Sequence, residues 1–223
     1  MTNGGSDSIV SIEGFAARSV RCDFGLLAVD VFVVDSLDRL VDRDELLRGD
    51  DIPEPPYWAH LWVGSRALAR HLAATTQNHS TAIDIGCGVG LAGLVAAKRG
   101  THTTFLDHAR EALAFVRASA ERNHLEADLL VSDLRRPGVD ARFDLCLAAD
   151  ATYDPELQRA LADFLVVHLA PAGVAWCAES VRMVDGGFHD ACRTRGLAVE
   201  AFQVTEMDEG VPVPVRLTRV AHV

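Results

Sequence analysis

The stretch TAIDIGCGVG, residues 81–90, sets a strand-like run of residues directly before three glycines at alternate positions. An alanine-rich stretch, Leu91–Lys98, follows and ends just before Gly100. This order predicts a strand, a glycine loop and a helix, in which the loop backbone can approach a ligand closely and the helix N-terminus offers free N–H groups. A tight turn without any ligand is the alternative interpretation of the glycines alone.

The same alternation of strand and helix continues from this unit toward the C-terminus. Strands are expected at 103–106, 129–131, 143–149 and 174–178, and helices at 109–123, 155–169 and 188–195. Strands that alternate with helices predict an α/β fold around a parallel sheet. Two final strands, 197–204 and 213–220, are joined by a short connection, which predicts an antiparallel finish. Asp154 is better placed than Asp150 to cap the helix that begins at Pro155.

The N-terminal quarter has a different character. Residues 1–10 are expected to form a loose tail and Ser19–Val34 a β-hairpin with Gly25 near its turn, before an acidic loop or short helix over 35–52. The proline-rich residues 53–56 mark a boundary, so we expect an extension over 1–52 and the main domain over 53–223. Helical spacing of apolar residues predicts a helix over Trp58–Leu72.

Composition excludes several classes of protein. The chain of 223 residues carries a net charge of −11, which disfavours non-specific binding to nucleic acid. Its five cysteines form no C-x-x-C pair, so no metal site is expected. The cysteines are instead expected to be free thiols in a reducing cytoplasm. No apolar run approaches the roughly 18 residues that a membrane helix needs, and no signal peptide is visible. A cytoplasmic monomer is expected.

Two acids accompany the glycine loop. Asp84 lies two residues before the first glycine, and Asp107 closes the next expected strand. A carboxylate after that strand is placed to accept hydrogen bonds from ribose hydroxyls. Asp84 is a poor neighbour for a pyrophosphate, and Leu91 occupies the last glycine position of the dinucleotide fingerprint. An oxidoreductase that binds a nicotinamide cofactor is therefore the weaker interpretation, and a ligand with a cationic end fits better.

Asp84-x-Gly86-x-Gly88-x-Gly90 followed by Asp107 resembles motif I, with its following acid, of the class I S-adenosylmethionine-dependent methyltransferases. The resemblance covers about residues 55–220. It implies a Rossmann-like seven-stranded sheet of order 3-2-1-4-5-7-6, with strand seven antiparallel and helices on both faces. It also implies S-adenosyl-L-methionine as cofactor, with Asp133 on the adenine amine. The implied cofactor-binding residues are Trp62, Asp84, Gly86, Cys87, Gly88, Gly90, Asp107, His108, Asp133 and Ala149.

Two further features narrow the group. The aromatic and small-residue pattern of residues 56–69 and the sequence Asp150-Ala-Thr-Tyr153 resemble the methyltransferase-like protein-lysine methyltransferases, whose motif is D-x-x-Y. Ala and Thr at 151 and 152 depart from the N/D-P-P-Y/F motif of many nucleic-acid amino-methyltransferases. The resemblance implies Asp150 and Tyr153 as catalytic residues, with Asp150 orienting an amine. His60, beside Trp58 and Trp62, is a minor candidate for a base.

Several interpretations of function therefore stay open. The leading one is an N-methyltransferase that acts on a protein lysine by in-line displacement, with no nucleic acid and no membrane as partner. The first alternative is a methyltransferase of a small metabolite or natural product. The second is a non-catalytic module that binds the cofactor. The acceptor and the number of methyl groups added are not encoded in any motif of the sequence.

Overall fold

A computed structural model describes residues 9–36, 56–180 and 187–223. Its main sheet has the spatial order β6 (Asp128–Val131), β5 (His102–Asp107), β4 (Thr81–Ile85), β7 (Phe143–Ala149), β8 (Leu169–Ser180), β10 (Val211–His222) and β9 (Leu197–Asp208). The neighbours from β6 to β8 are parallel, and β10 is antiparallel to both β8 and β9. This order is the one that the resemblance implies, and the expected fold class is confirmed.

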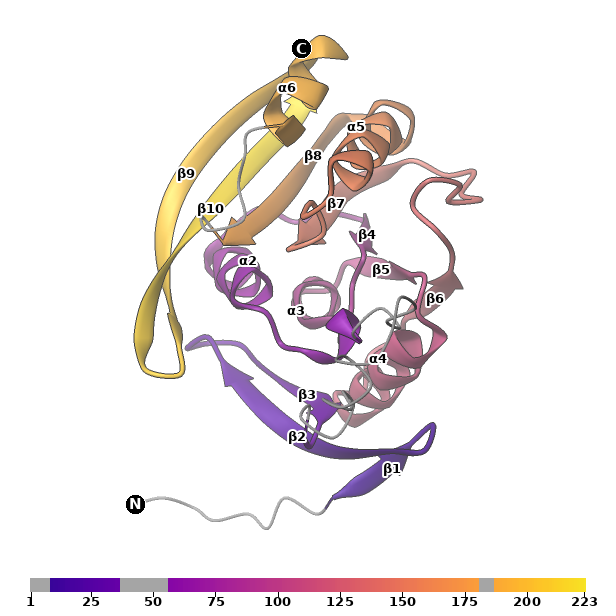
Figure 1. Ribbon diagram of the computed structural model, residues 1–223, viewed down its shortest axis with the longest axis vertical. Helices are drawn as coiled ribbons and strands as arrows, with labels where there is room; N and C mark the ends of the chain where they lie inside the picture. Colours follow the sequence, from indigo (N-terminus) through magenta and orange to yellow (C-terminus); the bar gives the residue numbers. More distant parts are fainter. Residues whose placement is uncertain (1–8, 37–55, 181–186) are drawn as a thin grey trace, which may run out of the picture.

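Helices cover both faces of the sheet (Figure 1). They are η2 (Tyr57–Ala59), a single 3₁₀ turn, then α2 (Val63–Ala74), α3 (Leu91–Lys98), α4 (Arg110–Arg122), α5 (Pro155–His168) and α6 (Gly187–Thr194). Buried residues of α2, α3 and α4 share one apolar core with one face of the sheet, and those of α5 and α6 share a second core with the other face. Alternate residues of β4 accordingly point into different cores, with Ala82 in the first and Ile83 in the second.

The N-terminal extension forms a separate antiparallel sheet of β1 (Val10–Ile12), β2 (Phe15–Asp23) and β3 (Ala28–Val34). It lies outside α3 and α4 as a third layer (Figure 1), and buried residues such as Val29 and Val31 belong to the first core. The predicted hairpin is confirmed. The prediction of a loose tail over residues 1–10 was wrong at Val10, which belongs to β1 and pairs with Ala17 of β2. β1 is too short to leave a pattern in the sequence.

Several predicted boundaries were wrong. The helix expected from Trp58 begins at Val63, because the chain after η2 is extended at His60 and again at Trp62. β8 begins directly after α5, at Leu169, well before the expected Val174. β9 and β10 are longer than expected because they pair with each other beyond the last β8 partner, Ser180. The expected acidic loop falls largely outside the described residues.

Candidate functional site

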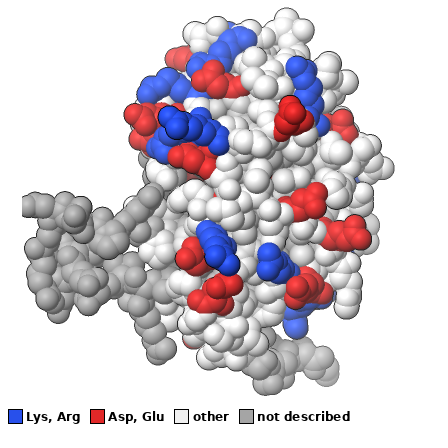
Figure 2. Space-filling view, turned by 90° about the vertical axis from the view of Figure 1, so that its right-hand side faces the viewer, with Lys and Arg blue, Asp and Glu red and all other residues white. Residues whose placement is uncertain are grey.

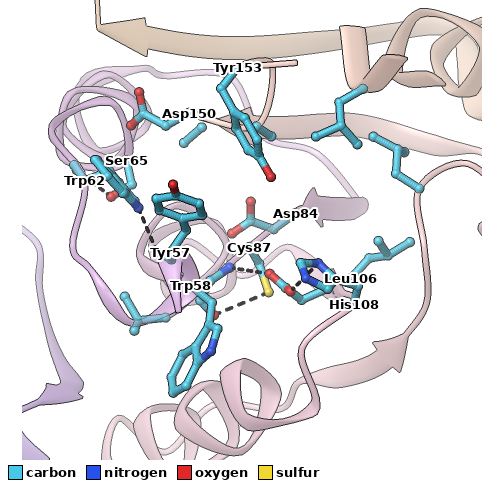
Figure 3. A pocket seen from close by; sticks show the side chains of 18 of the residues that line it. Tyr57, Trp58, Trp62, Ser65, Asp84, Cys87, Leu106, His108, Asp150 and Tyr153 are labelled. Carbon is cyan, nitrogen blue, oxygen red and sulfur yellow. Dashed lines mark hydrogen bonds and ion pairs between the residues drawn. The ribbon is translucent and has the colours of Figure 1, made fainter. Parts of the chain in front are cut away.

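The carboxyl ends of β4, β5 and β7 meet at one edge of the sheet, where a cavity of about 230 Å³ lies (Figure 3). We call it the glycine-loop cavity. Its lining includes, among the residues named from the sequence, Trp62, Asp84, Gly86, Cys87, Gly88, Asp107, His108, Asp133, Ala149, Asp150 and Tyr153. Ligands of open α/β sheets bind at this edge.

Gly90 is the predicted cofactor residue that does not line the cavity. It stands at the N-terminus of α3 with a φ of 80°, in the left-handed region. A Cβ atom there would lie 2.7 Å from Cγ2 of Val116 on α4. The third glycine of the loop is therefore needed for the turn and for packing against α4.

Asp107 closes β5 and is buried at the floor of the glycine-loop cavity. Its Oδ2 accepts a hydrogen bond of 2.8 Å from Gly88 N–H, and its Oδ1 accepts one of 2.9 Å from Ala109 N–H. Burial raises the pKa of this carboxyl group, and the two N–H donors partly oppose the shift. Each carboxylate oxygen has two acceptor sites, so the side chain can still accept from two ligand hydroxyls.

Asp84, on β4, is the second buried acid of the cavity. Its Oδ2 accepts a hydrogen bond of 2.8 Å from Gly93 N–H in the first turn of α3. Burial raises the pKa of Asp84 to about 7, opposed by the Gly93 N–H and helped by the nearby Asp107. A cationic ligand group beside Asp84 would reverse this shift, because an opposite charge favours the ionised carboxylate.

Comparisons with known proteins agree with this geometry. The family model "Methyltransferase small domain" matches residues 57–149, which contain the glycine loop and Asp107. The mouse protein N-lysine methyltransferase METTL21A is 32% identical over 108 residues, or 43% of this chain and 48% of that protein. The ribosomal RNA small subunit methyltransferase G of Synechococcus sp. (strain CC9902) is 32% identical over 143 residues, or 60% of this chain and 55% of that protein.

The solved structures include the 16S rRNA N2 G1207 methyltransferase RsmC of T. thermophilus in complex with AdoMet and guanosine. The match covers 96% of this chain and 52% of the RsmC chain, with a TM-score of 0.66 and 14% sequence identity, which establishes a common fold. Residues 57–149 of the chain carry the methyltransferase small domain, and the fold is that of the class I S-adenosylmethionine-dependent methyltransferases. The chain spans about half the length of the curated relatives that it matches.

The buried acids of the glycine-loop cavity fit the cofactor of this family, S-adenosyl-L-methionine. The cofactor brings a ribose diol, an amino-acid ammonium and a sulfonium, which together need hydrogen-bond acceptors and negative charge. Asp107 and Asp84 supply both within one cavity. Asp107 would hold the ribose, and Asp84 would face the cationic end.

Asp133 and His108 lie at the exposed rim of the cavity. The Asp133 carboxylate accepts a hydrogen bond of 2.8 Å from Arg135 N–H and is 3.3 Å from the Arg135 guanidinium, and these contacts lower its pKa. Nδ1 of His108 is 3.4 Å from Oδ1 of Asp107. Arg135 also lines the cavity and was missed from the sequence, because nothing in its neighbourhood distinguishes it from a surface arginine.

The backbone of Trp58 lies beside the glycine loop, and its ring packs in the core. An ideal Cβ at Gly88 would come within 3.0 Å of the Trp58 carbonyl oxygen. The indole packs between Phe15 of β2 and Phe115 of α4, at centroid distances of 5.5 and 5.3 Å. The N-terminal sheet therefore helps to hold the segment that covers the glycine loop.

Three aromatic side chains converge beside the glycine-loop cavity (Figure 3). Tyr57 lies 6.3 Å from Trp62 and 6.0 Å from Tyr153 between ring centroids. The Trp62 indole N–H donates a hydrogen bond of 2.8 Å to the Tyr57 carbonyl oxygen, which fixes the ring across the turn. All three are partly exposed, although large aromatic groups are usually well buried. We call Tyr57, Trp62 and Tyr153 the aromatic triplet.

A second cavity, of about 320 Å³, adjoins the first and shares the aromatic triplet, His60 and Asp150 with it. Its further lining residues are Val63, Thr152, Glu179, Ser180, Asp208 and Val213. Asp150, Glu179 and Asp208 bring three carboxylates, and no lysine or arginine stands among the described lining residues. Glu179 is the last residue but one of the apolar strand β8, which is a signal that could have identified it from the sequence; Asp208 leaves no such signal.

Asp150 lies between the two cavities in a strained backbone conformation, with a φ of 52°. Its Oδ1 accepts a hydrogen bond of 3.2 Å from Ser180 N–H, and its carboxylate lies against Gly64 at the start of α2. Burial raises the pKa of Asp150 to about 6, although the backbone N–H groups of Ser180, Gly64 and Ser65 act to lower it. Asp150 thus faces the positive end of α2, and α5 is capped by Asp154, as predicted.

No group of residues suited to a metal ion occurs within the described ranges. The five cysteines are free thiols. None of the described helices is long and apolar enough to cross a membrane.

Proposed function

We propose that this methyltransferase transfers a methyl group from S-adenosyl-L-methionine to the side-chain amine of a protein lysine. The observation that carries the proposal is the composition of the second cavity, where the aromatic triplet stands beside Asp150, Glu179 and Asp208. Aromatic faces and carboxylates both attract an alkylammonium group. Asp150 and Tyr153 would contact the acceptor, and the cofactor would be held by the predicted residues of the glycine-loop cavity.

A nucleic-acid acceptor is less consistent with these charges. Nucleic-acid binding needs clustered lysine and arginine side chains. Figure 2 shows a face on which basic and acidic side chains are intermingled without a continuous basic stripe. The sequence Asp150-Ala-Thr-Tyr153 also lacks the two prolines typical of base amino-methyltransferases. The identity of 32% to METTL21A supports a lysine acceptor, and the equal identity to methyltransferase G makes RNA the class to be tested against it.

The test is to incubate the protein with radiolabelled cofactor and a fractionated lysate, and then to digest samples with protease or ribonuclease. Protease-sensitive label that is released by acid hydrolysis as methyl-lysine supports the proposal. Label that ribonuclease removes overturns it in favour of RNA, and label in small molecules favours a metabolite acceptor. Cofactor binding without any transfer indicates a non-catalytic module. The variant Asp107→Ala is the control for transfer that depends on the cofactor site.

We further propose a monomer that works in the cytoplasm. The free thiols, of which Cys146, Cys177 and Cys192 are buried, are consistent with a reducing compartment.

A further inference from the structure

His60 stands where the two cavities meet. It directly follows η2, lines both cavities, and turns its ring edge toward Trp62 at a centroid distance of 4.6 Å. The ring makes no hydrogen bond to any residue that the structure describes. Burial lowers the pKa of His60 below its usual value, so the ring is neutral at neutral pH.

Charged groups face this ring from each element packed against it. Asp208 at the end of β9 and Glu209 in the following turn favour its protonated form, and Arg66 of α2 disfavours it. Arg66 and Asp208 also form an ion pair with each other, so their effects on the ring partly cancel. His60 is therefore a neutral base beside two cavities, held near the edge of the aromatic triplet.

The other bases of the second cavity already accept hydrogen bonds. Asp150 accepts from Ser180 N–H and lies against the start of α2. The Glu179 carboxylate accepts a short hydrogen bond from the Thr152 hydroxyl, and Asp208 is paired with Arg66. Protonation of Glu179 or Asp208 would break a charge-assisted contact, whereas protonation of His60 breaks none. Asp150 keeps one buried oxygen, Oδ2, without a hydrogen-bond partner, but it lies against Gly64 at the start of α2, away from the edge of the aromatic triplet where His60 stands.

We propose that His60 accepts the proton that a lysine ammonium must lose before methyl transfer, an inference that rests on the proposed function. The acceptor nitrogen gives its proton to a ring nitrogen of His60. Its freed electron pair forms the bond to the methyl carbon while the bond from that carbon to sulfur breaks, with its electrons staying on sulfur. A methylammonium group and a neutral thioether result, and the His60 imidazolium returns its proton to water.

The experiment compares His60→Asn with the wild-type chain, using Nα-acetyl-lysinamide as acceptor and radiolabelled cofactor. Loss of a general base lowers rates by about 100-fold or more, so we expect at least a 10-fold slower transfer near pH 7. The deficit should shrink to about threefold near pH 10, because roughly a quarter of a lysine amine with a pKa of about 10.4 is then already deprotonated in solution. Cofactor affinity should stay within about twofold.

His71→Asn is the matched control. His71 is also half-buried, its pKa is also lowered by burial, and its ring packs on an indole, that of Trp176, at 4.1 Å. It lines neither cavity. We expect its variant to transfer methyl groups at the wild-type rate.

A readout independent of turnover is the NMR titration of the histidine rings with the demethylated cofactor bound. Adding Nα-acetyl-lysinamide should lower the pKa of His60, because a cation binds beside it, and leave that of His71 unchanged. A deficit in His60→Asn that is equal at all pH values, an equal deficit in His71→Asn, or an unmoved His60 resonance would each overturn the inference. If wild-type transfer to lysine is retained in any of these cases, the proposed function stands without it.

Discussion

The N–H group of Gly88 donates a hydrogen bond of 2.8 Å to Oδ2 of Asp107 and thereby joins the glycine loop after β4 to the end of β5. The two features that indicate the cofactor in the sequence thus stabilise each other directly. Because the N–H groups of Gly88 and Ala109 each occupy one acceptor site of the carboxylate, two acceptor sites remain for a ligand in the cavity that Asp107 lines. The geometry of the glycine loop and the proposed contact with the ribose therefore depend on one carboxylate.

Asp107→Asn should weaken binding of S-adenosyl-L-methionine by roughly 10- to 100-fold, which corresponds to the loss of a charge-assisted hydrogen bond of about 1.5–3 kcal/mol. Calorimetric titration measures the change. Asp128→Asn is the control, since Asp128 is exposed, bonds to His102 and lines neither cavity. Unchanged affinity in Asp107→Asn would contradict the assignment of the ribose to this residue.

Cofactor binding should release a proton from Asp84. Its pKa of about 7 falls when a cationic group binds beside it, so the affinity should rise as the pH increases from about 6 to 8 and then level off. Calorimetry in two buffers of different ionisation enthalpy counts the protons released. Asp84→Asn should bind more weakly and lose this pH dependence; retention of the full pH dependence in that variant would assign the proton to another group.

The same carboxyl group makes the stability of the unliganded protein depend on pH. The pKa of Asp84 is higher in the folded than in the unfolded chain, so its stabilising contribution is complete below about pH 4 and is lost as the pH rises through about 7. Asp84→Asn should therefore reduce the fall in unfolding free energy over this range, measured by urea denaturation at several pH values. An unchanged fall would assign it to other buried acids, such as Asp107 and Asp150, whose pKa values are also raised.

The parts of the site that could be predicted are those whose signals are local. A strand that runs into glycines and an acid that closes the next strand are both readable within a few residues, and so is the Asp154 cap before Pro155. Together with the regular alternation of strands and helices, they predicted an α/β fold around a parallel sheet and a ligand site at the glycine loop, whereas the order of the strands was implied by the resemblance to class I methyltransferases.

The second cavity could not be predicted because its residues come together only through long-range packing. Asp208 reaches it by the extra length of the β9–β10 pair, which depends on cross-strand pairing and on its ion pair with Arg66. Asp150 was recognised from its motif, but its contact with Gly64 depends on how α2 packs across the end of β7. A single sequence gives no information on such pairs.

Gly64→Ala should destabilise the fold through Asp150. An ideal Cβ at Gly64 would lie 2.3 Å from Oδ2 of Asp150, and a clash of this kind costs about 1–3 kcal/mol of unfolding free energy. In the double variant with Asp150→Ala the clash is removed, so the cost of Gly64→Ala should fall below about 1 kcal/mol. Denaturant titration of the four proteins measures the coupling, and additive effects would show that α2 moves to accommodate the methyl group.

Asn123→Ala should loosen β3 from α4. The Asn123 side-chain amide donates to the carbonyl oxygen of Asp30 at 2.6 Å and accepts from its N–H at 3.0 Å, which satisfies the edge of the strand. Losing both contacts should cost about 1–3 kcal/mol of unfolding free energy, which urea denaturation measures. Hydrogen exchange should become faster at the Asp30 amide and stay unchanged at the Phe32 amide.

Ser119→Ala provides the reciprocal control for this edge. The Ser119 hydroxyl accepts a hydrogen bond of 2.9 Å from Phe32 N–H, so its loss should accelerate exchange at Phe32 and spare Asp30. The N-terminal sheet also supports Trp58 through Phe15, so both variants should affect cofactor binding. We expect the loss in binding free energy to be smaller than the loss in unfolding free energy. Equal acceleration at both amides in either variant would mean that β3 opens as one unit, and that these two side chains do not protect the strand separately.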